Sequence, residues 1–194
     1  MDSLSRVQQR LLEYYNALRP PDGRIPRRTD LNPQNIKPLL AWVVMARSSG
    51  PGNLVPTVIG SAVDEILHMS FTGRNLLDMY PVPLREIIDG FYQTILTTPC
   101  GGMFTRNLGS SFGSVKGYRS LLLPLEDRDG EVSQMVGVIT VAGLENEAPG
   151  FGKPKDVSSV QLLDLRYLDI GFGAPPAPMV PHEPSRVWPD DSEE

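Results

Sequence analysis

The sequence predicts an α+β domain in which antiparallel strands follow a helical middle. Three segments rich in β-branched and aliphatic residues come one after another at Met103–Leu108, Tyr118–Leu125 and Met135–Ala142. The last two are separated by DRDG at 127–130, and an Asp-Gly pair favours a β-hairpin because glycine adopts the positive φ that such turns need. Helical periodicity precedes these strands and does not alternate with them, which favours α+β over parallel α/β.

Two further strands are predicted before the helical middle, at Trp42–Met45 and Val55–Gly60, with the turn SSGPGN between them at 48–53. The segment Leu84–Thr98 has helical spacing and is closed by Pro99. Its apolar face comprises Leu84, Ile87, Ile88, Phe91 and Ile95.

The N-terminal segment Leu4–Leu18 is predicted to be an amphipathic helix. Ser5 and Gln8 have the spacing of a capping box, and Arg19-Pro20-Pro21 ends the helix. The apolar stripe, with alternating spacings of three and four, consists of Leu4, Val7, Leu11, Tyr14 and Leu18. This stripe can pack on the chain's own sheet or pair with a second copy, and it is too short to form a coiled coil alone.

The length, net charge and cysteine content of the chain exclude several classes of protein. The chain has 194 residues, which suits one domain with extensions, and a net charge of −5 that argues against a duplex-DNA binder. Cys100 is the single cysteine, so no intramolecular disulfide can form. No apolar run approaches the ~20 residues of a membrane span, and the N-terminus lacks an apolar signal core. We therefore expect a cytoplasmic protein with no nucleic-acid or membrane partner.

The order of three short motifs resembles a known family. GSAVDEIL at 60–67, TGRNLLDM at 72–79, a longer helix and then LLLPL at 121–125 resemble the PAS-like single-domain proteins common in bacteria. The resemblance extends over roughly Leu12–Val141. It implies a PAS-like fold, with a five-stranded antiparallel sheet, helices on one face and an N-terminal flanking helix. PAS-type domains often dimerise through such a helix.

The resemblance also implies three regions of chain. Residues 1–30 form the flanking helix and connector, 31–146 the PAS-like domain, and 147–194 an irregular C-terminal arm with a proline-rich acidic tail. Within the arm, Val157–Ile170 is apolar enough to be ordered, as an added strand or as an irregular packing arm. From Gly171 onward we expect an extended or mobile tail, since its composition buries little apolar surface.

In a PAS-like fold, the long helix crosses a curved sheet and walls a cavity. The implied lining residues are nearly all apolar and include no convergent acid–base pair, which fits a small apolar or amphipathic ligand or a simply packed core. These residues are Ile59, Leu67, Phe71, Leu77, Phe91, Ile95, Phe104, Leu121, Leu123 and Val138.

The sequence supports neither haem nor flavin, and the cofactor is left unknown. Flavin photosensors of the PAS class carry a reactive cysteine after G-R-N, whereas Leu76 follows Asn75 here, so the covalent photoadduct cannot form. His68 is the candidate haem ligand, but a lone histidine is a weak signal.

Two nucleophiles suggest an enzyme only weakly. GSSFG at 109–113 fits the G-x-S-x-G pattern around Ser111, but a polar loop follows, and the downstream histidine, His182, lies in the proline-rich tail. Cys100 follows Pro99 in a loop where a thiol could be accessible, with no neighbouring base to activate it.

The sequence therefore predicts a non-enzymatic sensory or regulatory protein. We expect it to act through contact, as a homodimer and with an unidentified signalling protein, biased by a small apolar ligand in the cavity. The alternatives are a ligand-free adaptor or dimerisation protein and a small hydrolase that uses Ser111.

Overall fold

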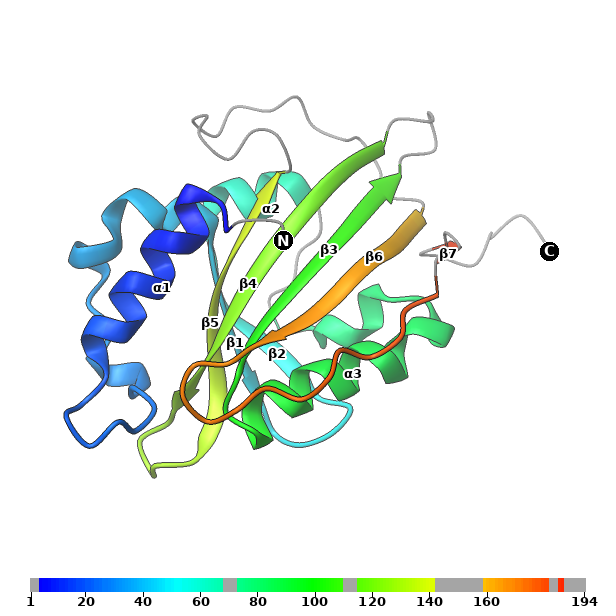
Figure 1. Cartoon of the computed structure of the whole chain (residues 1–194). Helices are drawn as coiled ribbons and strands as arrows, with labels where there is room; N and C mark the ends of the chain where they lie inside the picture. The colour runs from blue at the N-terminus through cyan, green and yellow to red at the C-terminus, as the bar shows by residue number, and fades with distance from the viewer. Residues whose placement is uncertain (1–3, 68–72, 110–114, 142–158, 182–184, 187–194) are drawn as a thin grey trace.

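The computed structural model describes residues 4–67, 73–109, 115–141, 159–181 and 185–186. Its centre is an antiparallel seven-stranded sheet with the order β2-β1-β5-β4-β3-β6-β7 (Figure 1). The strands are β1 (Val43–Ser48), β2 (Leu54–Ile59), β3 (Gly101–Gly109), β4 (Val115–Glu126), β5 (Val132–Val141), β6 (Ser159–Leu168) and β7 (Ser185–Arg186).

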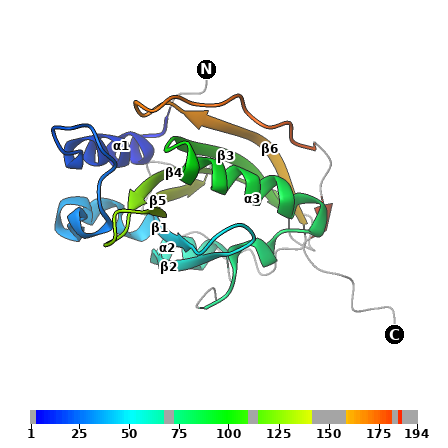
Figure 2. The same cartoon turned by 90° about the horizontal axis from the view of Figure 1, so that it is seen from below.

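All five predicted strands are present as β1 to β5, and the sheet then continues beyond β3. β6 pairs with β3 over its whole length, from Gly101 opposite Leu168 to Gly109 opposite Ser159. Of the two interpretations of 157–170, the structure therefore has the added strand. The irregular arm starts after it: residues 169–181 run back beside β6 toward β7, which pairs with the start of β6 (Figures 1 and 2).

Helices cover both faces of the sheet. They are α1 (Arg6–Leu18), η1 (Arg28–Asp30), η2 (Pro33–Trp42), α2 (Ser61–Leu67), η3 (Leu76–Met79) and α3 (Val82–Thr97), where η marks a 3₁₀ helix. The predicted long helix thus begins at Val82, two residues earlier than expected. α1 and α3 lie on opposite sides of the sheet (Figure 2). We call the side that faces α3 the inner face and the side that faces α1 the outer face.

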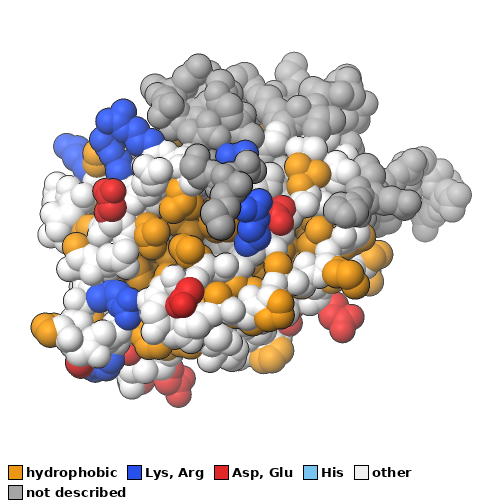
Figure 3. All heavy atoms as spheres, in the orientation of Figure 1, with side chains coloured by type: hydrophobic (Ala, Val, Ile, Leu, Met, Phe, Trp, Pro, Cys, Tyr) orange, Lys and Arg blue, Asp and Glu red, His pale blue; other side chains and the backbone are white. Residues whose placement is uncertain are grey.

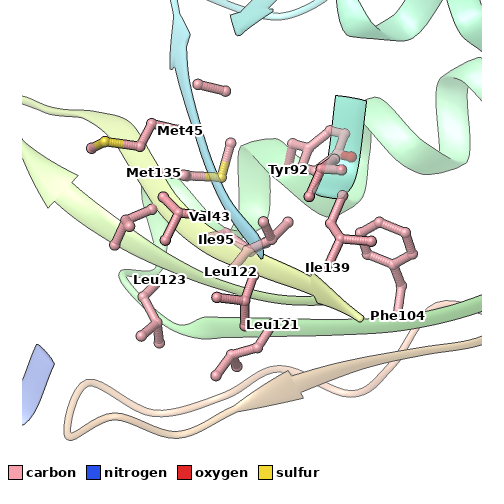
Figure 4. Close-up of a cluster of buried hydrophobic side chains, with 14 of the residues drawn as sticks. Val43, Met45, Tyr92, Ile95, Phe104, Leu121, Leu122, Leu123, Met135 and Ile139 are labelled. Carbon is pink, nitrogen blue, oxygen red and sulfur yellow. The ribbon is translucent and has the colours of Figure 1, made fainter. Parts of the chain in front are cut away.

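A close approach between the backbone of β3 and the helix α3 identifies the inner face. A Cβ at Gly102 would lie 2.2 Å from Cδ1 of Ile95 and 2.8 Å from the Phe91 ring, so glycine lets α3 rest directly on β3. Gly102 stands opposite Leu122 on β4, so Leu122 shares the inner face. Leu121 and Leu123 point to the outer face, and both are fully buried (Figure 4).

α1 packs on the outer face of its own sheet. Its cap is the predicted box: the Gln8 amide donates to Ser5 Oγ at 3.3 Å, and the Ser5 amide donates to Gln8 Oε1 at 2.9 Å. The buried side of the helix is Gln8, Leu11 and Tyr15, and the Tyr15 hydroxyl donates to the carbonyl of Pro124 at 2.8 Å. Of the predicted stripe, therefore, only Leu11 is fully buried in the core.

The T-G-R-N motif has an architectural role. Asn75 Oδ1 accepts from the amides of Leu54 and Leu77 at 3.0 and 3.2 Å, and its Nδ2 donates to the Gly52 carbonyl at 2.7 Å. One side chain thereby caps η3 and ties it to the β1–β2 hairpin.

Two further contacts hold this region in place. Asp78 Oδ1 lies 3.9 Å from Nη1 of Arg85, which joins η3 to α3. Gly60 does not need an unusual φ. A Cβ there would lie 2.4 Å from the carbonyl oxygens of Leu40 and Ala41, so its role is close packing against η2.

We predict that Tyr15→Phe lowers the free energy of unfolding by about 1 kcal/mol, because a buried carbonyl loses its donor. Tyr14→Phe is the matched control: its hydroxyl accepts from the Asn32 amide at 2.7 Å at an exposed site where water can replace it. Urea unfolding of both variants checks this. An equal loss of unfolding free energy in the two variants would contradict the role of Tyr15 in docking α1 on the sheet.

Candidate ligand site

A cavity lies on the inner face, between the sheet, η3 and α3. It contains about 570 Å³ of space between protein atoms, including the part open to solvent at its mouth. Water centres can occupy about 50 Å³ of it, against the roughly 10–15 Å³ that one water requires. The lining residues are Val44, Met45, Ala46, Leu54, Pro56, Ile59, Val63, Leu76, Tyr80, Tyr92, Phe104, Arg106, Leu122, Met135 and Ile139.

The walls come from elements that strand alternation and helix packing bring together. Phe104 of β3 and Ile139 of β5 share the inner face, because both stand opposite Ser120 of β4. Tyr92 comes from α3, and the three side chains lie together at one end of the apolar cluster in Figure 4. Leu76, which occupies the position where flavin photosensors of this class carry cysteine, also lines the cavity.

The predicted cavity residues are divided between two faces. Ile59 and Phe104 line the cavity. Leu77, Phe91 and Ile95 are buried in the core, but they are not among the lining residues.

Leu121, Leu123 and Val138 lie on the outer face, away from the cavity, because Leu121 stands opposite Val138 and next to inner Leu122. The apolar run LLLPL does not itself show which alternate residues face α3. The Leu67 side chain and Phe71 lie outside the described residues.

The cavity contains a charged side chain, Arg106, that the sequence patterns did not predict there. Arg106 is 2% exposed, and its Nη1 donates to the Tyr80 hydroxyl at 2.7 Å. Its Nε is buried and has no hydrogen-bond partner in the described structure. The guanidinium carbon lies 5.2 Å from the Phe104 ring centre and 5.8 Å from that of Tyr80. The sequence of β3 does indicate this position. Phe104, Arg106 and Leu108 are two residues apart along the strand, so their side chains lie on the same face of the sheet.

The phenols around Arg106 remain neutral. Burial raises the pKa of Tyr92 well above its usual value, and a hydrogen bond shared with Tyr80 adds to this effect, while Arg106 opposes it. Burial likewise raises the pKa of Tyr118. At neutral pH neither tyrosine supplies a negative charge to the cavity.

The candidate nucleophiles give no active site within the described residues. Cys100 is fully buried, and its thiol donates to the Thr94 carbonyl at 3.8 Å, so the expectation of an accessible thiol was wrong. Burial raises the pKa of this thiol to about 11. Ser111, His68 and His182 lie outside the described residues.

The described residues contain no candidate metal cluster and no candidate membrane-spanning helix. Among the described residues, no group of three or more histidine, cysteine, aspartate or glutamate side chains could hold a metal ion. No helix there is long and apolar enough to cross a membrane.

An antiparallel sheet crossed by one long helix, with a mostly apolar cavity between them, defines an α+β domain. The family model described as PAS domain matches residues 3–140. This chain belongs to the PAS domain family, which confirms the resemblance and the PAS-like fold.

Solved structures show related folds at low identity. The light-state LOV domain of the blue-light photoreceptor Aureochrome1 is 17% identical, with a TM-score of 0.41 over 57% of this chain and 88% of that chain. Its dark-state structure is 18% identical, with a TM-score of 0.43 over 62% and 89%. A Vibrio cholera VqmA–ligand–DNA complex is 12% identical, with a TM-score of 0.37 over 57% and 51%. No curated protein matches the chain.

Membership of this family supports a sensory or regulatory module. PAS domains are generally non-enzymatic, and they commonly mediate protein interactions, dimerise and bind small ligands.

We predict that Cys100 reacts slowly with iodoacetamide in the native protein. Burial raises the pKa of the thiol from its ordinary value of 9.0 to about 11, so the thiolate at pH 7.5 is about a hundredfold scarcer than in the unfolded chain. Labelling should accelerate in guanidinium chloride and, in the native protein, between pH 8 and pH 11. Equal rates for native and unfolded protein at pH 7.5 would contradict this burial.

Proposed function

We propose that this chain is a non-enzymatic sensory or regulatory module whose output is protein contact, biased by a small ligand in the inner-face cavity. The observation that carries the proposal is the cavity itself. It is largely apolar, it is walled by five strands and three helical elements, and within the described residues it lacks an acid–base pair or an activated nucleophile.

The sheet offers a route from the cavity to the opposite surface. Leu122 lines the cavity, whereas its neighbours Leu121 and Leu123 are buried on the outer face, the side of the sheet on which α1 lies (Figure 2). Closely packed interiors transmit small displacements. A ligand that fits one arrangement of β4 better than another would therefore shift the populations of α1 positions.

The contact we propose is a homodimer through the outer face. Leu4, Val7, Tyr14 and Leu18 of the predicted stripe remain partly exposed, whereas Leu11 is unavailable. Hydrophobic side chains gather at the border between α1 and the outer face of the strands (Figure 3). Half-buried Met103 of β3 extends this surface, as does Leu163, 37% exposed where the β3–β6 register shifts.

We predict that Leu18→Glu weakens dimerisation by about tenfold or more, since it places a charge in an apolar contact. Ala17→Glu is the matched control: it introduces the same charge in the same helical turn, at an exposed neighbouring position. Analytical ultracentrifugation over a concentration series measures both. Equal effects of the two substitutions, or a wild type that is monomeric throughout, would reject this interface.

Native mass spectrometry of gently purified protein tests the ligand. We expect a dimer with a reproducible extra mass, and we expect Ala46→Leu, which fills the cavity, to lose that mass while retaining the fold by circular dichroism. A dimer at the bare sequence mass would favour a ligand-free adaptor. Extra mass retained by Ala46→Leu would place the ligand elsewhere.

A further inference from the structure

We propose that the ligand of this cavity is a small organic monocarboxylate, with its anionic group on the guanidinium of Arg106 and its apolar body against Phe104, Leu122 and Ile139. The inference deepens the proposed function and rests on it, because it names the chemical class of the molecule that the cavity takes.

The first step is the unbalanced charge of Arg106. A side chain 2% exposed carries a full positive charge that it cannot lose at physiological pH. Buried charges in proteins are normally paired with an opposite charge. Among the described residues, ion pairs join Arg24 with Asp22, Arg27 with Glu126, Arg85 with Asp78, and Arg166 with Asp164, and none of these includes Arg106.

The surroundings compensate this charge only in part. Tyr80 accepts one hydrogen bond from Nη1, and the faces of Phe104 and Tyr80 provide cation–π attraction. These neutral groups leave the net charge in place. The phenols of Tyr92 and Tyr118 cannot remove it, because burial keeps their pKa values raised.

The second step is the geometry of the guanidinium. Nη1 is occupied by Tyr80, whereas the buried Nε–H on another edge has no partner among the described residues. Arg106 lines the cavity, and in the proposed complex the carboxylate takes this edge, which is covered in the free protein. A planar carboxylate matches the fork of donors that a guanidinium presents.

The third step is the chemistry of the rest of the wall. Apart from Arg106 and two tyrosines, every lining side chain is apolar. One cation neutralises one anionic group, so a dianionic phosphate would leave charge uncompensated against hydrocarbon. The 50 Å³ open to water centres limits the ligand to a short aliphatic chain or one aromatic ring. These features together specify a monocarboxylate with a compact apolar body.

The unpaired charge of Arg106 also predicts how its substitution changes the melting temperature of the ligand-free protein. If Arg106 serves the ligand and not the fold, replacing it with methionine of similar length removes an unpaired buried charge. Arg106→Met should then melt at the wild-type temperature or above it when no ligand is present. An arginine that is part of the structural core would instead lower the melting temperature when removed.

The test uses the full chain, wild type and Arg106→Met, with sodium isobutyrate, hexanoate and phenylacetate as probes and the three corresponding amides as neutral controls. We expect at least one acid to raise the melting temperature of the wild type, and its amide to have no such effect. Calorimetric titration should show about 10- to 100-fold weaker binding of that acid to Arg106→Met. Arg106→Lys, which keeps the charge but not the fork, should lie between the two.

The results that would overturn the inference are equally definite. Acids that stabilise Arg106→Met as well as the wild type, acids and amides that act alike, or no acid that acts at all would each reject the carboxylate. If Arg106→Met does not fold, the acid–amide comparison on the wild type and the Lys variant decides. If these experiments reject the carboxylate but native mass spectrometry still shows a bound neutral molecule, the proposed function stands. If the protein is found at its bare sequence mass, both the carboxylate and the proposed function are rejected.

Discussion

The structure depends on the burial of β4 and β5 from both sides. Three consecutive leucines, Leu121, Leu122 and Leu123, are all buried, although a strand directs alternate residues to opposite faces. Such a strand requires a cover on each side. α3 supplies the inner cover, resting on Gly102, and α1 supplies the outer one through Leu11 and Tyr15. The flanking helix is therefore part of the core, because Leu11 and Tyr15 are fully buried.

The cavity lies where the rigid half of the molecule meets its less regular half. β3, β4 and β5 form long continuous ladders, whereas the opposite wall comes from short β1, β2 and the single-turn η3. Asn75 joins η3 to the hairpin through three hydrogen bonds. The proposed function requires a wall with two arrangements, and we propose that the short elements supply it while the sheet keeps its register.

Arg106 relates the fold to its proposed chemistry. The chain could have placed an apolar residue at this inner position of β3, as it does at Phe104 and Leu108 on either side. A guanidinium there costs stability unless an anion accompanies it. The cavity thus combines an apolar shape, which many molecules fit, with one charge that few of them satisfy. Selectivity would follow from the penalty for leaving that charge unpaired.

Local physics in the sequence was enough to determine the elements. The capping box of α1, the Asp-Gly hairpin, the two early strands and the long helix follow from hydrogen-bonding side chains, turn residues and periodicity within a few positions. Only the tertiary structure decided which alternate residues of LLLPL face α3, that 159–168 joins β3 as a strand, and that Arg106 is buried with no carboxylate partner among the described residues. The reason is that period two divides a strand into two sets without naming the inner one, and the partners that bury or neutralise a side chain lie far along the chain.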